Sequence, residues 1–176
     1  MIKAETMLKK LNLFMLGIIL ILGLSCSKEK ELNIDEKDLT SCEKGASCKY
    51  LFTEKSDLDK SPIVVIPGDY RLFLVENTIG ASQVSLFIKA PMDTQQFTLN
   101  DKDIQNGKVK YYQVCLSCDY VALKPVGGSV KGKNLTPEKP ANQSKWLIEA
   151  TILMEGVNNP TVKHTVYVKQ YFTPNF

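Results

Sequence analysis

Short runs in which apolar and polar residues alternate fill the chain from residue 62 to its end. Alternation with a period of two is typical of strands that bury one face. The clearest runs are 69–76, 82–90, 108–114, 145–155 and 161–172, and the weaker ones are 63–66, 95–99 and 119–124. Turn sequences such as Pro67-Gly68 and Asn106-Gly107 separate them. This pattern predicts an all-β domain, an antiparallel β-sandwich of immunoglobulin-like architecture with about seven or eight strands, and a small β-barrel is the alternative.

Two segments interrupt the pattern. Residues 125–145 are rich in Pro, Gly, Lys and Asn, with room only for a short edge strand around Val130. Because binding residues on rigid β scaffolds concentrate in loops, we expect this segment to form a binding surface. Its candidate residues are Lys131, Lys133 and Asn134.

The other segment comes before the strands. Residues 26–61 are mostly polar and charged, which predicts a flexible tether, and in it only Tyr50-Leu51-Phe52 looks able to dock on a core. The predicted organisation is therefore a removable segment at 1–25, a tether at 26–61 and a β-sandwich domain at 62–176.

The N-terminal segment has the pattern of a signal peptide. Lysines precede the apolar stretch 11–24, which is shorter than the roughly 20 residues that a membrane-spanning helix needs. Gly23-Leu24-Ser25-Cys26 then resembles the lipobox of bacterial lipoproteins, although Gly23 stands where Leu is usual. The resemblance implies cleavage before Cys26 and attachment of a diacylglycerol and palmitate to that residue. More than one acyl chain gives stable membrane anchoring. Ordinary secretion with Cys26 in a disulfide is the alternative.

The residues after Cys26 bear on the cellular compartment, and the net charge of the chain bears on the class of partner. No Asp follows Cys26, so we expect the outer membrane of the cell envelope, with its face left open. Removing 1–25 takes away three lysines and one glutamate and leaves a nearly neutral chain. Such a chain lacks the basic surface of a nucleic-acid-binding protein. Arg71 is the single arginine, so a bidentate anion site would have to be centred on it.

Four cysteines remain after Cys26: Cys42, Cys48, Cys115 and Cys118. In an exported protein they most often form two disulfides. Three pairings are possible, and a crossed pairing is favoured, because residues three apart in a straight strand point to opposite faces.

The spacing of Cys115 and Cys118 also fits a redox site, but such sites lie at a helix N-terminus, whereas strands flank this pair. The spacing of Cys42 and Cys48 is too wide for a typical zinc knuckle, so no metal or cofactor is expected.

Two further residues carry alternative interpretations. His164 is the only histidine and lies on the apolar side of the last strand, where a structural role is the commoner one. Trp146 fits the core better than a sugar-binding face shared with Tyr111, Tyr112 and Tyr167.

Taken together, the sequence favours a non-enzymatic lipoprotein that binds an envelope protein or glycan, or acts in assembly. A thiol–disulfide protein that uses Cys115 and Cys118 is the alternative. A hydrolase inhibitor is a third hypothesis that rests on fold analogy alone.

Overall fold

The computed structural model describes residues 31–59, 63–115 and 118–175. The predicted signal peptide, the lipobox-like sequence and Cys26 lie outside these residues. Residues 32–176 form one compact unit. Because this unit contains every described strand and its own core, we expect it to fold without the preceding segment.

The described residues form an all-β fold, as the alternating pattern predicts. The strands are β1 Ser47–Leu58, β2 Val65–Pro67, β3 Tyr70–Ile79, β4 Ser82–Pro91, β5 Gln96–Leu99, β6 Val109–Cys115, β7 Leu123–Asn134, β8 Trp146–Gly156 and β9 Lys163–Pro174. Only short helical turns interrupt them: α2 Asp101–Asp103, η1 Ile104–Lys108 and η2 Ala141–Gln143.

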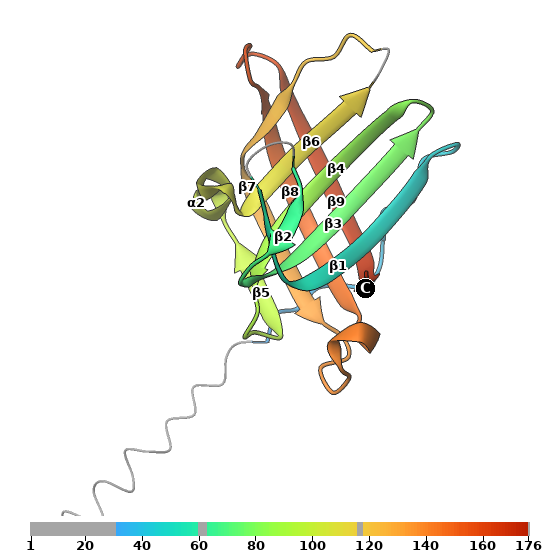
Figure 1. Ribbon diagram of the computed structural model, residues 1–176, viewed down its shortest axis with the longest axis vertical. Coiled ribbons are helices and arrows are strands. Elements are labelled where there is room, and N and C mark those ends of the chain that lie inside the picture. The colour runs from blue at the N-terminus through green and yellow to red at the C-terminus, as the bar shows by residue number, and fades with distance from the viewer. Residues whose placement is uncertain (1–30, 60–62, 116–117, 176) are drawn as a thin grey trace, which may run out of the picture. The chain divides into compact units, whose positions relative to one another are not determined.

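The strands form one curled sheet in the order β5-β7-β8-β9-β1-β3-β4-β6, with β2 on β1 (Figure 1). Two antiparallel halves meet where β1 and β9 run parallel, and these two strands pair only at Leu51–Thr173 and Phe52–Pro174. Among the described residues no ladder joins β6 to β5 or β7. The sheet is therefore a half-barrel, with the facing layers of a sandwich and the continuous curl of a barrel.

Aromatic side chains fill the space between the two halves. The Phe73 ring on β3 lies with its centroid 5.4–5.7 Å from the rings of Phe52, Phe97, Trp146 and Phe172. These partners come from both halves, so the sheet folds over one continuous core. Trp146 is fully buried, which confirms its interpretation as a core residue.

Arg71 has a structural role beside this core. Its guanidinium donates hydrogen bonds to the Glu54 carboxylate and to the carbonyls of Pro91, Met92 and Thr94. It also stacks 4.3 Å from the centre of the Trp146 ring. Five bonds use all the donors of a guanidinium, so Arg71 is not the centre of an anion site.

The tether prediction is wrong for residues 47–58. They form β1, which pairs with β3 and lies near the middle of the sheet. Tyr50 and Phe52 face the core, while charged residues before and after them, such as Lys49 and Lys55, give the segment its polar composition. The preceding residues also pack on the domain, since Ile34 is buried and Thr40 hydrogen-bonds to Lys169.

The predicted loop at 125–145 is wrong for its first half. Residues 123–134 form β7, which pairs with β5 and β8. Glycine is needed at Gly132 because a Cβ there would overlap the Phe97 ring and approach Ile148. The glycines therefore mark a strand that other groups approach closely. The strand predicted at 119–124 begins only at Leu123.

Candidate functional site

The inward-facing residues of β1, β3, β4 and β6 form successive rows across the sheet. One row, Phe52–Phe73–Ile88–Val109, is fully buried in the core. The next row is Tyr50–Val75–Leu86–Tyr111, in which only Leu86 is buried and the other three residues are partly covered. The row beyond it contains Cys48, Asn77 and Val84. On β1 and β3 the side chains of this last row are therefore smaller and more polar than those of the core row.

A cavity of about 360 Å³ lies at this end. The opposite wall consists of β9 residues, including His164, Val166, Tyr167 and Val168. β1 and β9 pair only at Leu51–Thr173 and Phe52–Pro174, so the parts of both strands that precede these residues are not paired and the two walls lie apart here. The volume lies near the lower limit of small-molecule pockets, about 300–1,000 Å³, and the mouths of barrels are frequent sites for them.

The polar groups of the cavity surround an apolar floor. The Oδ1 atom of Asn77 is buried and has no hydrogen-bond partner among the described residues. The Tyr111 hydroxyl donates to Oε1 of Gln113 at 3.3 Å, and the Tyr50 ring packs edge-on against Phe172. Burial raises the pKa of both Tyr50 and Tyr111, so both hydroxyls stay protonated at neutral pH.

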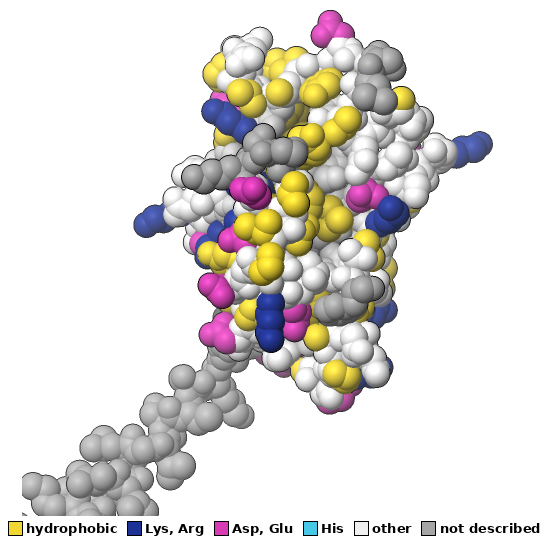
Figure 2. All heavy atoms as spheres, in the orientation of Figure 1, with side chains coloured by type: hydrophobic (Ala, Val, Ile, Leu, Met, Phe, Trp, Pro, Cys, Tyr) yellow, Lys and Arg dark blue, Asp and Glu magenta, His cyan; other side chains and the backbone are white. Residues whose placement is uncertain are grey.

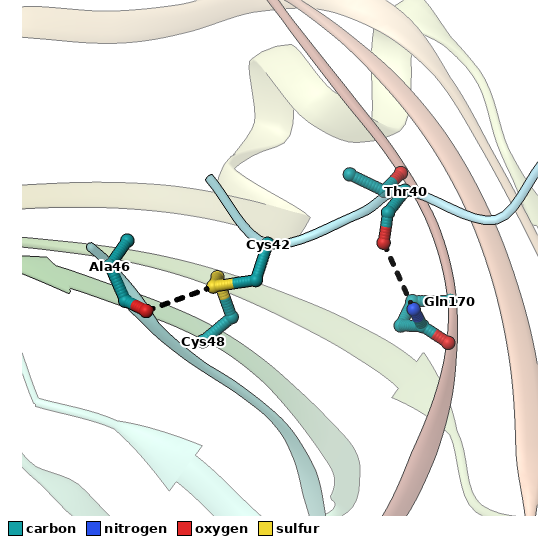
Figure 3. The surroundings of a disulfide bond; sticks show 5 residues. All are labelled: Thr40, Cys42, Ala46, Cys48 and Gln170. Carbon is teal, nitrogen blue, oxygen red and sulfur yellow. Dashed lines mark hydrogen bonds between the residues drawn. A yellow bond between two sulfur atoms is a disulfide. The ribbon is translucent and has the colours of Figure 1, made fainter. Parts of the chain in front are cut away.

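A strap of residues 40–48 forms the rim beside β9. The backbone N–H of Thr40 donates to the Lys169 carbonyl at 2.8 Å, and the amide of Gln170 donates to the Thr40 carbonyl at 3.0 Å. A disulfide then joins Cys42 to Cys48, and Cys48 itself lines the cavity (Figure 3). The strap is thus held at both ends, by β9 and by β1.

The four cysteines form two disulfides, Cys42–Cys48 and Cys115–Cys118, with Cα–Cα distances of 5.8 Å and 5.4 Å. The crossed pairing favoured from sequence is therefore wrong. Cys42 precedes a turn closed by a hydrogen bond from Ala46 to Glu43. Cys115 is the last residue of β6, so the straight-strand argument does not apply to Cys118.

The surface predicted at Lys131, Lys133 and Asn134 does not contribute to the cavity. All three lie on β7, where Lys131 forms an ion pair with Glu149 at 3.6 Å. Asn134 is 8% exposed and donates from its amide to Gln95 at 2.7 Å. Asn134 therefore stabilises the β5–β7 connection.

Other residues singled out from the sequence do line the cavity, namely His164, Tyr111 and Tyr167. Sequence reasoning missed Tyr50 and Asn77. A signal for Asn77 was available in the sequence, because Asn77 is a polar residue on the same side of β3 as the apolar Phe73 and Val75.

The described residues contain no group of three His, Cys, Asp or Glu side chains placed to hold a metal ion. Within the same part of the chain, no helix is long and apolar enough to span a membrane. Positive and negative side chains are interspersed on the face in Figure 2, without a large patch of one sign. Comparisons with models of protein families, curated proteins and solved structures found no match.

Proposed function

We propose that this protein is a non-enzymatic binding protein of the bacterial cell envelope, held to the outer membrane by lipid on Cys26. The cavity at the open end of the half-barrel receives a small ligand. The cavity is the observation that carries this proposal.

Two features support a binding role for the cavity. Its apolar walls come from rigid strands of both halves of the sheet, so they are largely pre-formed. Its polar groups, which include Asn77, Tyr111 and His164, lie around the apolar floor, where they can orient a bound molecule.

The test uses residues 27–176, which include the whole compact unit, and the neutral fluorescent probe N-phenyl-1-naphthylamine. This probe becomes bright in apolar sites, so saturable fluorescence is expected. Val166→Trp fills the cavity from β9 and should abolish the signal. Thr165→Trp adds the same ring on the exposed side of β9 and should leave the signal intact.

Thermal melts show whether each variant is folded. If Val166→Trp does not fold, Val84→Phe replaces it, because this exchange fills the cavity from the opposite wall. Equal probe binding by the wild type and a folded, filled variant would reject the cavity as the site.

Anchoring is tested separately in cells that express the full chain. An alkyne analogue of palmitate should label the wild type, and the protein should sediment with membranes. Cys26→Ala should lose both properties. Membrane retention of unlabelled Cys26→Ala would exclude lipid on Cys26 as the anchor.

A further inference from the structure

The cavity combines an apolar interior with one buried acceptor that lacks a donor. We infer that its ligand is a neutral ring compound with a hydroxyl or N–H group, and that this group donates a hydrogen bond to Oδ1 of Asn77. This inference rests on the proposed function, because it names the ligand class of the same cavity.

The acceptor provides the first argument. Asn77 lies on β3 directly between Cys48 of β1 and Val84 of β4, in the row nearest the open end. Its Oδ1 is buried and has no hydrogen-bond partner among the described residues, although buried polar groups are nearly always hydrogen-bonded. The χ2 torsion of Asn is broad, so a rotation of the amide presents Oδ1 to a ligand in the cavity that Asn77 lines. A ligand that supplies a donor removes this cost, whereas an otherwise identical ligand without a donor leaves it in place.

The next row of side chains indicates the shape of the ligand. Val75 and Leu86 form an aliphatic floor, and Tyr50 and Tyr111 stand at its two ends. Val166 and Val168 face this floor from β9. A flat ring contacts aliphatic groups with its faces and tyrosine rings with its edges, so it fits this space.

The charges indicate that the ligand is neutral. No Lys or Arg is among the described residues that line the cavity. An anionic ligand would therefore lose its hydration without gaining a Lys or Arg partner. Among the described lining residues, Glu43 is the one acid and His164 the one imidazole, and both are exposed to solvent.

The experiment measures how three compounds displace N-phenyl-1-naphthylamine from residues 27–176. The compounds are 4-propylphenol, 1-fluoro-4-propylbenzene and 4-propylbenzoate. Fluorine is close in size to a hydroxyl but cannot donate a hydrogen bond. We expect the phenol to bind about tenfold more tightly than the fluoro compound and more than tenfold more tightly than the benzoate.

Variants then assign this preference to Asn77. Asn77→Leu keeps the size of the side chain and removes the acceptor, so the ratio of phenol to fluoro affinity should fall to about one. Thr78→Leu makes the same kind of exchange at the adjacent, outward-facing position of β3 and should keep the wild-type ratio. Asn77→Ala removes the acceptor without adding bulk, and it replaces Asn77→Leu if the melt of that variant is not cooperative.

The outcomes separate this inference from the proposed function. Equal affinity for the phenol and the fluoro compound, tightest binding of the benzoate, or an unchanged ratio in Asn77→Leu overturns the ligand class while the cavity remains a binding site. Failure of the probe and all three compounds to bind overturns the proposed function as well.

Discussion

Replacing Arg71 with Met removes five hydrogen bonds at a site that is 4% exposed. Loss of one partner of a buried ion pair costs about 3–5 kcal/mol. The partner here, Glu54, has a side-chain exposure of 22%, so water compensates part of its loss. We therefore expect the free energy of unfolding to fall by about 3 kcal/mol, the lower end of this range. For a domain of this size, that loss corresponds to a fall in Tm of roughly 6–12 °C.

The assay is equilibrium unfolding in guanidinium chloride, followed by circular dichroism and by fluorescence of the single Trp146. The two signals should give the same midpoint if unfolding is two-state. Lys131→Met is the matched control, because it removes a cation from the exposed Lys131–Glu149 pair and should cost less than about 0.5 kcal/mol. Arg71→Lys keeps the charge but loses the planar fork, so it should fall between Arg71→Met and the wild type.

A loss of less than about 1 kcal/mol in Arg71→Met would refute the structural role argued for this residue. The same conclusion would follow if Lys131→Met cost as much as Arg71→Met, since burial would then not be the deciding factor.

Two further perturbations test the rim and the turn before β6. Replacing Cys42 and Cys48 together with Ser should cost about 2 kcal/mol by the loop-entropy model and should weaken binding of N-phenyl-1-naphthylamine; unchanged denaturation and binding would show that the disulfide does not hold the strap. Asp103 accepts hydrogen bonds from Lys108 and from the backbone N–H of Asn100, and these lower the pKa of its carboxyl. Its stabilising effect is therefore present above its unfolded pKa of about 3.9 and is lost as the pH falls through the lower folded value. Asp103→Asn should reduce Tm at pH 7 and much less at pH 3, and an equal reduction at both would contradict this linkage.

The fold class could be predicted because alternation is a local property. The runs 69–76, 82–90 and 145–155 became β3, β4 and β8 with small shifts at their ends. β1 was missed because most of its side chains are polar or charged, and only Tyr50 and Phe52 show the inward apolar alternation. β7 was missed because its glycines suggested turns. A sequence does not show whether a glycine is needed for a turn or, as at Gly132, for a close approach by the Phe97 ring.

The disulfides and the cavity depend on features that local patterns do not contain. Pairing of Cys42 with Cys48 requires the turn at Glu43–Ala46, and no alternation signals it. The cavity requires the parallel contact of β1 with β9 at Phe52 and Pro174, which are far apart in the chain. The inward direction of Asn77 follows from the pattern of β3, but its place in the row above Tyr50 follows only from the register.

The cavity arises where the two halves of the sheet separate and several of their inward side chains are short. Along β3 the inward residues change from Phe73 to Val75 to Asn77. Along β9 the same face carries Phe172, then Gln170, which bonds to the strap, and then Val168 and Val166. Aromatic rings meet across the core where the two halves are joined, and the smaller residues cannot meet where the halves separate. The aromatic core therefore stabilises the fold at one end of the half-barrel, and the cavity at the other end is the proposed binding site. The exchanges at Arg71 and at Val166 should therefore have separable effects: the first should lower Tm with little change in probe affinity of the folded protein, and the second should abolish probe binding with little change in Tm.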